Sequence, residues 1–251
     1  MYFKKIAHFL LDACLPPCCA LCGEAHQLDG SALSGNDLLC AHCRTDFFSQ
    51  QTKRCSRCAL PLPATETSKL CGDCLQQPPH FDATCAVCDY EPPFDELVVR
   101  FKFHRQLHLA ALFATTLRDH AIEQAHTLPD LLCPVPLGAL RLSERGYNQS
   151  LEIARHLSKL LGIPCQPELL VRTKETPPQS SLAQDARHFN LRDAFTAHPE
   201  WQHAIEGQHI GVIDDVMTTG TTLNETAACL KHFGASKVSN LIFARTPRNK
   251  L

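Results

Sequence analysis

The sequence predicts an α/β protein in which a parallel β-sheet with flanking helices follows a small cysteine-rich domain. Two observations lead to this fold class. From residue 130 onward, strand-like and helix-like segments alternate, a pattern typical of parallel strands joined by right-handed crossovers. Ten of the 15 cysteines lie within the first 74 residues, so the N-terminal region has a different organisation from the rest.

Length and composition agree with two domains of unequal size. The chain has 251 residues, and Gln76–Pro79 is a polar, proline-containing boundary. We therefore expect an N-terminal helix and cysteine-rich domain over residues 1–78, and the sheet domain over residues 79–251. Apolar residues make up 44% of the chain, and the formal net charge is -2. This charge excludes an overall polybasic surface for nucleic acid, so any anion site must be local.

The N-terminal cysteines occur in four C-x-x-C pairs. The pairs are Cys19 and Cys22, Cys40 and Cys43, Cys55 and Cys58, and Cys71 and Cys74. Two intervening residues let both sulfurs bind one ion, and two pairs complete a tetrahedral site, so the spacing predicts a double zinc ribbon with two zinc ions. Sharing between consecutive pairs is the simplest arrangement, and an interleaved one is the alternative. Both sites are structural, because cysteines fill every position.

The other cysteines near these pairs have different interpretations. Cys14 and Cys18 exceed the count of ligands, and Cys18 leaves the register of the first ligand open by one residue. Cys85 and Cys88 have the same C-x-x-C spacing but lie in a strand-like segment. Positions three apart on a strand point to opposite faces, so we expect these two side chains to pack and not to bind metal.

The N-terminus resembles a short signal peptide only superficially. The apolar run of residues 6–15 is interrupted by His8 and Asp12, and no small-x-small cleavage site follows, which favours an amphipathic helix. No stretch approaches the about 18 apolar residues that span a bilayer, so no membrane span is expected. Repeated C-x-x-C pairs beside an α/β core indicate thiolate ligands in a reducing compartment, and we predict a cytoplasmic protein.

Three elements are predicted after the boundary. Residues 83–90 are a strand, residues 94–106 are a helix, and residues 107–125 are an amphipathic helix. The first helix carries Arg100, Lys102 and Arg105. These cations form either a solvated face or one wall of an anion site.

A strand over residues 130–135 is followed by a candidate anion site. It ends in a rigid turn that contains Pro136 and Leu137, and Arg141 and Arg145 follow four residues apart. Arginines beyond a strand's end suit the binding of an anion. A helix-capping loop with surface arginines is the alternative.

The next segments continue the alternation. The apolar spacing predicts a helix over residues 149–161 that ends at Gly162, and a short strand over 169–172. Residues 173–190 are polar and long enough for a mobile lid, which includes Lys174 and Arg187.

The most informative segment, residues 210–222, reads I-G-V-I-D-D-V-M-T-T-G-T-T. A buried strand delivers two adjacent carboxylates, and the loop that follows precedes a helix over 221–233. Unpaired N–H groups at a helix N-terminus, together with threonine hydroxyls, suit a phosphate monoester. The carboxylates can accept hydrogen bonds from a vicinal diol or hold a divalent cation through water. The residues concerned are Asp214, Asp215, Thr218, Thr219, Gly220, Thr221 and Thr222. An ordinary crossover with helix-capping aspartates is the alternative, but it needs no such threonine-rich loop. A final strand is predicted over 237–244.

This 13-residue segment resembles the 5-phosphoribosyl-1-pyrophosphate (PRPP) signature of type I phosphoribosyltransferases. The resemblance implies a phosphoribosyltransferase-like sheet that binds PRPP together with magnesium. A lid that closes over PRPP would shield the reacting carbon from water, and Lys174 or Arg187 would then reach the leaving pyrophosphate.

Over residues 16–246 the chain is similar to the ComF/GntX family of competence-associated proteins. The resemblance rests on the cysteine pairs, P-V-P-L, R-G-Y-N-Q, the segment 179–191 and the PRPP block. It implies PRPP at the acidic pair and threonine loop, with pyrophosphate near Pro136, Leu137 and Arg141. Some family members are implicated in taking up or processing transforming single-stranded DNA.

Two functions follow from this resemblance. The first is an enzyme that transfers the phosphoribosyl group of PRPP to a nucleophile that the sequence does not identify. In it, Asp214 and Asp215 orient the ribose, the threonine loop holds the 5-phosphate, and Arg141 or Lys174 assists departure of pyrophosphate. The second is a non-catalytic factor that senses PRPP and either binds single-stranded DNA through the ribbons and the 100–105 face or docks competence-machinery proteins.

Overall fold

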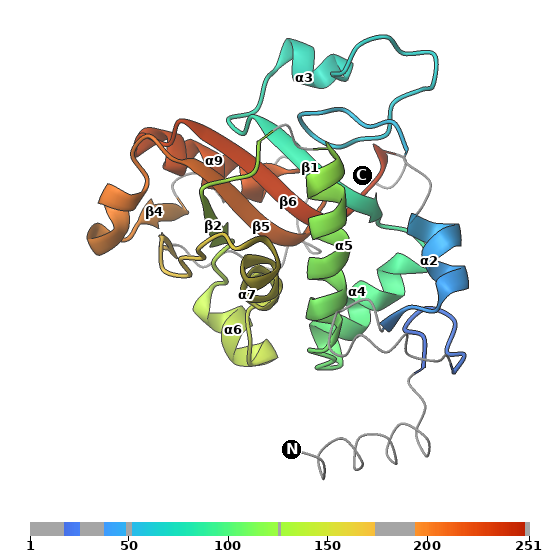
Figure 1. Ribbon diagram of the computed structural model, residues 1–251. Helices are drawn as coiled ribbons and strands as arrows, with labels where there is room; N and C mark the ends of the chain where they lie inside the picture. The colour runs from blue at the N-terminus through green and yellow to red at the C-terminus, as the bar shows by residue number, and fades with distance from the viewer. Residues whose placement is uncertain (1–17, 26–37, 49–51, 125–126, 174–193, 249–251) are drawn as a thin grey trace. The chain divides into compact units, whose positions relative to one another are not determined.

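The computed structural model describes residues 18–25, 38–48, 52–124, 127–173 and 194–248 (Figure 1). Contacts along the chain define two compact units, residues 1–51 and residues 52–251. The first unit contains an antiparallel bridge between Cys18 and Ala25, followed by helix α2 (Ala41–Phe48). The amphipathic helix predicted at the N-terminus lies outside the described residues.

The second unit is built on a four-stranded parallel sheet with strand order β1-β6-β5-β2. The strands are β1 (Ala83–Asp89), β2 (Leu131–Pro134), β5 (His209–Met217) and β6 (Lys237–Arg245). Most residues of β5 and β6 are buried, as expected for parallel strands covered on both faces. The parallel sheet predicted from the alternation of strands and helices is therefore confirmed.

Helices cover the two faces of this sheet (Figure 1). Helix α5 (Leu109–Gln124) packs on β1 and β6, and α7 (Gln149–Leu161) packs on β2 and β5 and against α5. Helix α9 (Thr221–His232) contacts β5 and β6 from the opposite face. The crossover helix α9 thus starts directly beyond the carboxyl end of β5.

The remaining elements are short. They are α3 (Gly72–Gln76), α4 (Phe94–Phe103), α6 (Ala139–Arg145), β3 (Leu170–Arg172), β4 (Phe195–Ala197) and the 3-10 helix η3 (Pro199–Ala204). Strands β3 and β4 form a separate antiparallel pair. The candidate lid was predicted over residues 173–190, and all of it except Thr173 lies outside the described residues.

Aromatic packing holds α4 and α5 on the sheet. The rings of Phe113 and Phe243 stack with centroids 3.8 Å apart, and Phe101 meets Phe113 edge to face at 5.2 Å. All three side chains are fully buried. This cluster fixes the C-terminal half of α4 close to the end of the sheet where β1 and β6 finish, and it thereby positions Lys102.

The second group of four cysteines shares a core with the sheet. Cys55, Cys58, Cys71 and Cys74 are all buried, and they belong to one apolar cluster with residues of β5, β6 and α9. The main chain joins them as well, because the Thr84 N–H donates to the Ser56 carbonyl at 3.1 Å. The boundary at 78/79 stays a prediction from composition.

Cys85 and Cys88 lie on β1 as predicted. Cys88 is buried and Cys85 is partly buried, and the Cys88 thiol donates to the Phe243 carbonyl at 3.4 Å. Burial raises the pKa of the Cys85 thiol to about 12, which is unlike a metal ligand. Within the described residues, no helix is both long and apolar enough to cross a bilayer.

Candidate functional site

Polar side chains converge where β1, β2 and β5 end. A pocket of about 210 Å³ opens there, beyond the carboxyl edge of the parallel sheet, which is the usual ligand site of such sheets. Its lining includes nearly all the residues predicted for the site. These are Pro136, Leu137, Arg141, Asp214, Asp215, Thr218, Thr219, Gly220, Thr221 and Thr222.

The first carboxylate, Asp214, is held by its neighbours. Its Oδ1 accepts hydrogen bonds from the Ser150 hydroxyl at 2.9 Å and from the Asp215 N–H at 3.0 Å. Burial, reinforced by the negative charge of Asp215, raises the pKa of Asp214 to about 7. The acidic pair therefore carries less than two full negative charges near neutral pH, which favours an oxygen-rich ligand.

The second carboxylate, Asp215, is paired with a cation from another element. Its Oδ1 lies 3.0 Å from Nζ of Lys102 on α4, and its side chain is 8% exposed. Lys102 therefore lines the pocket and is not part of a solvated face, and its ammonium faces a carboxylate. Arg100 instead donates from Nε to Gln106, and Arg105 is exposed.

The threonine loop joins β5 to the N-terminus of α9. Gly220 caps the helix with φ +85°, and a Cβ placed there would lie 2.5 Å from Met217 Cε, so glycine suits this position. The hydroxyls of Thr219 and Thr221 lie 2.8 Å apart. Positive helix-end polarity and several hydroxyls therefore face the pocket, which is chemistry suited to an anion.

The opposite side of the pocket is built by α6 and the start of α7. Gly146 ends α6 with φ +79°, and Asn148 caps α7 by accepting from the Ser150 N–H. The Asn148 amide also donates to the Val135 carbonyl at 3.0 Å, which joins this turn to the end of β2. Arg141 and Arg145 both line the pocket, so the loop caps helices and also presents cations.

Sequence reasoning missed several lining residues. Gln149 and Ser150 come from the start of α7, Tyr90 follows β1, and Arg172 ends β3. Gln149 is 2% exposed, and its amide nitrogen has no hydrogen-bond partner of normal geometry within the described residues. Such a buried donor is rare and fits a ligand oxygen. No periodicity in the sequence distinguishes these residues from ordinary helix and strand ends. Lys174 and Arg187 lie outside the described residues.

The eight predicted cysteine ligands form two groups. Within each group the sulfurs lie within 4.8 Å of one another; the groups are Cys19, Cys22, Cys40 and Cys43, and Cys55, Cys58, Cys71 and Cys74. Consecutive pairs therefore share a site, as predicted, and the interleaved arrangement does not apply. Each group also contains a main-chain hydrogen bond to sulfur. The Cys43 N–H donates to the Cys40 Sγ in the first group, and the Cys71 N–H donates to the Cys55 Sγ in the second.

The thiol chemistry of the second group fits a dication. A hydrogen bond from Cys58 lowers the pKa of Cys55 to about 4, whereas the same interaction and burial raise the pKa of Cys58. Four thiolates this close repel one another unless a metal ion compensates their charge. Both groups are thus four-cysteine zinc-binding sites of the closed, structural kind.

Known proteins are similar to this chain over most of its length. A double zinc ribbon domain matches residues 10–75. DNA utilization protein YhgH of Escherichia coli is 34% identical over 212 residues, which cover 83% of this chain and 90% of that protein. Competence protein F of Haemophilus influenzae is 32% identical over 214 residues, covering 79% and 93%. Competence protein ComFC of Bacillus subtilis is 25% identical over 243 residues, covering 91% and 95%.

Solved structures align over about half of the chain. A purine phosphoribosyltransferase from Pyrococcus horikoshii aligns with a TM-score of 0.32 and 22% identity, covering 53% of this chain and 70% of that chain. The glutamine PRPP amidotransferase of Bacillus subtilis aligns with a TM-score of 0.34 and 20% identity, covering 52% and 26%.

Proposed function

Because the chain belongs to the ComF/GntX family, together with DNA utilization protein YhgH and competence protein F, we propose that it is a PRPP-binding, phosphoribosyltransferase-like protein that acts in DNA utilization. The observation that carries this proposal is the pocket in which the acidic pair, the threonine loop and two arginines meet. Each of these three groups matches one part of PRPP.

The 5-phosphate is assigned to the threonine loop. The N-terminus of α9 and the hydroxyls of Thr219 and Thr221 supply hydrogen-bond donors for a phosphate. The loop itself contains no carboxylate that would repel the phosphate. The ribose diol is assigned to Asp214 and Asp215, which lie near the end of β5, two residues before that loop. Adjacent acceptors of this kind suit a vicinal diol.

The pyrophosphate is assigned to the turn after β2 and to Arg141. Pro136 and Leu137 line the pocket beside it, and Arg145 lies on the same side. Guanidinium groups match phosphate oxygens geometrically and stabilise the charge that develops when pyrophosphate leaves. Magnesium, when bound with PRPP, neutralises part of the pyrophosphate charge, and the acidic pair is the oxygen-donor group available to hold it, directly or through water.

Lys102 deepens this assignment. Its ammonium pairs with Asp215 at 3.0 Å, so one carboxylate is neutralised before any ligand arrives. An anionic sugar phosphate approaches such a pocket with less repulsion than it would meet from two free carboxylates. Lys102 is thus a positioning residue for the ribose, acting through Asp215.

The test is calorimetric titration of PRPP with magnesium into the wild type and Asp215→Asn. We expect the variant to lose at least about tenfold in affinity, because a charged acceptor of hydrogen bonds is removed. Asp119→Asn, which removes an exposed carboxylate on α5, is the matched control and should bind as the wild type does. Unchanged affinity of the Asp215→Asn variant for PRPP would contradict the assignment of the ribose to this pocket.

Binding and catalysis are separated by a second measurement. Release of pyrophosphate from PRPP, in the presence of candidate acceptor bases, reports transfer of the phosphoribosyl group. Arg141→Gln should slow this release more than it weakens binding, because the arginine is assigned to the leaving group.

A non-catalytic DNA-binding role is a second candidate, and the end of α4 favours it. Phe103 is 63% exposed, and the guanidinium of Arg145 lies 5.2 Å from its ring centroid. His104 and Arg105 are exposed beside it. Exposed aromatic rings next to cations are the usual platform for bases of single-stranded nucleic acid.

This role is tested by fluorescence anisotropy of a labelled single-stranded oligonucleotide. Phe103→Ala should weaken binding, with a loss of about 1–3 kcal/mol per stacked base, whereas Ile122→Ala on α5 should not. Binding should also fall steeply with added salt. A flat salt response, or equal affinity of both variants, would refute DNA binding at this surface.

A further inference from the structure

We propose that Arg245 is a positioning residue that couples the second four-cysteine site to the loop Met217–Gly220, so that this loop keeps its anion-binding shape only while zinc occupies that site. The coupling is a property of residues within one compact unit. Its consequence for PRPP rests on the function proposed above.

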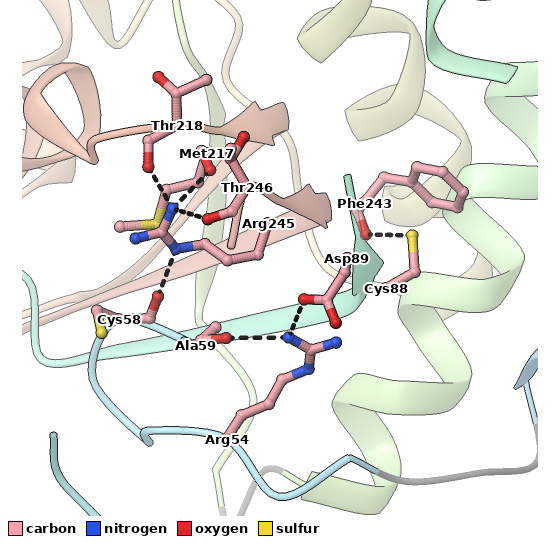
Figure 2. Close-up of polar contacts among 10 residues, drawn as sticks. All are labelled: Arg54, Cys58, Ala59, Cys88, Asp89, Met217, Thr218, Phe243, Arg245 and Thr246. Carbon is pink, nitrogen blue, oxygen red and sulfur yellow. Dashed lines mark hydrogen bonds and ion pairs between the residues drawn. The ribbon is translucent and has the colours of Figure 1, made fainter. Parts of the chain in front are cut away.

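Arg245 is the last residue of β6, and its side chain is 2% exposed. Its guanidinium donates from Nε to the Cys58 carbonyl at 2.9 Å, and from Nη1 to the Met217 carbonyl at 3.0 Å and to the Thr218 carbonyl. It also donates to the Thr246 carbonyl at 2.8 Å (Figure 2). One planar group therefore joins a zinc-ligand residue to the start of the ligand loop.

The contacts on the loop side orient its peptide groups. In a trans peptide the C=O and the following N–H point in opposite directions. Because the carbonyls of Met217 and Thr218 turn toward Arg245, the N–H groups of Thr218 and Thr219 turn away from it. The Met217 carbonyl also accepts a hydrogen bond from the Thr246 N–H at 3.0 Å, from the residue that follows Arg245. The same loop residues line the pocket, where an anion would need N–H donors.

The contacts on the cysteine side hold the turn that carries Cys58. Ala59, the next residue, has φ +57°, a conformation that is strained for a residue with a side chain. Its carbonyl accepts from Arg54 at 3.1 Å, and Arg54 also pairs with Asp89 at the end of β1 at 2.7 Å (Figure 2). Two arginines thus anchor consecutive carbonyls, and only Arg245 continues from there to the ligand loop.

The metal matters to Arg245 because it fixes the residue whose carbonyl accepts from Arg245 Nε. Within the described residues, the hydrogen bonds of Arg245 go to main-chain carbonyls, and the Cys58 carbonyl is one of them. A four-cysteine zinc site holds the Cys58 sulfur in a closed tetrahedron, and the energy of metal binding stabilises the fold of the residues around it. When zinc is lost, the turn that carries Cys58 is no longer fixed, and its carbonyl no longer holds the guanidinium in place.

Coupling between two binding sites acts in both directions. If zinc stabilises the loop, then a ligand on the loop must stabilise zinc binding by the same free energy. This reciprocity gives a readout at the metal site that is independent of enzymatic activity.

The experiment measures zinc loss and loop mobility on the full-length protein. A chelator is added, and the thiols that lose zinc are alkylated and mapped by peptide mass spectrometry. The four cysteines of the second site (Cys55–Cys74) and the four of the first site (Cys19–Cys43) are followed separately. Hydrogen exchange of peptides from the 217–222 loop is followed in parallel. The first four-cysteine site lies in the other compact unit and is the internal control.

We expect Arg245→Lys to speed alkylation of Cys55–Cys74 by about 10-fold or more, the usual effect of losing a partner of a metal ligand, and to leave Cys19–Cys43 unchanged. Lysine keeps the charge but cannot hold these four carbonyls with one planar group as arginine does. Arg248→Gln is the matched control, because Arg248 also contacts the ribbon, at Asp73, but is exposed. It should behave as the wild type does.

Wild-type protein supplies the decisive arm, even if Arg245→Lys fails to fold. Loss of zinc from the second site should raise exchange in the 217–222 loop while β5 and the C-terminal half of α9 stay protected. Unchanged exchange of the loop would overturn the coupling, and so would a rise that spreads equally through β5, because that reports general unfolding.

A final arm separates this inference from the proposed function. PRPP with magnesium should slow alkylation of Cys55–Cys74 in the wild type but not in Arg245→Lys. If PRPP has no effect while Arg245→Lys still accelerates zinc loss, then the coupling holds and PRPP is not the ligand of the loop.

Discussion

At the scale of single residues, one carboxyl group is held in an unusual state. Asp214 receives two hydrogen bonds, which favour its ionised form, yet burial and the charge of Asp215 dominate and raise its pKa to about 7. A raised pKa means that the folded protein keeps a proton that the unfolded chain releases between about pH 4 and pH 7. The contribution of Asp214 to stability therefore falls as pH rises through this range.

Asp214→Asn should remove this dependence on pH. Between pH 6 and pH 8 we expect the wild type to lose about 1 kcal/mol of unfolding free energy relative to the variant, because only the wild type must ionise a buried carboxyl. Urea denaturation at the two pH values measures the difference. Asp119→Asn serves as the control and should show the same change in unfolding free energy as the wild type. The same change in Asp214→Asn would contradict the raised pKa of Asp214.

At the scale of elements, strand β5 organises the site. It pairs with β2 on one side and β6 on the other, so its carboxyl end lies between the turn that carries Pro136 and the end of β6 at Arg245. Its position depends on close packing at Gly211. A Cβ there would lie 2.7 Å from Pro129 Cγ and 3.0 Å from side-chain atoms of Leu132 and Leu241.

Gly211→Ala should therefore destabilise the protein by about 1–3 kcal/mol, the usual effect of overpacking a core. A lower midpoint of thermal unfolding would show it. The matched control is Gly72→Ala, because nothing lies within 4 Å of a Cβ built at that position. Equal midpoints for the two variants would mean that the strand shifts to make room.

At the scale of the whole molecule, the two four-cysteine sites belong to different compact units. The second shares its apolar core with the sheet, as Leu60 and Phe81 pack in one cluster with Val212 and Ile242. The first is held within residues 18–48 by short-range bonds such as that from the Cys19 N–H to the Glu24 carbonyl. We therefore expect the two zinc ions to support different parts of the protein.

Elemental analysis of protein prepared without chelator should give about two zinc ions per chain. Replacing Cys22 and Cys43 by serine should leave one, and the sheet unit should still unfold cooperatively, since its own site is intact. A metal content near zero in the wild type would overturn both sites. Loss of cooperative unfolding in the serine variant would contradict the independence of the second unit.

Much of the fold could be predicted because it depends on local patterns. The helix over 149–161 coincides with α7, since its apolar spacing, its Asn148 cap and Gly162 are all local signals. The cysteine spacing likewise predicted the sharing of each zinc site by consecutive pairs. Strand ends differed from the predicted ends by one residue, as for β2 and β6, because strands end where pairing stops.

The sequence by itself therefore determined the parallel sheet, the two four-cysteine groups, and the strand that leads into the acidic pair and the threonine loop. Each of these features depends on residues that lie close together in the sequence. Only the tertiary structure decided that Lys102 pairs with Asp215, that Ser150 bonds Asp214, and that Arg245 joins Cys58 to the ligand loop. These partners lie 64 to 187 residues apart along the chain, counted from Ser150 to Asp214 and from Cys58 to Arg245. Packing of helices on the sheet, and not any local pattern, brings such distant groups within hydrogen-bond distance.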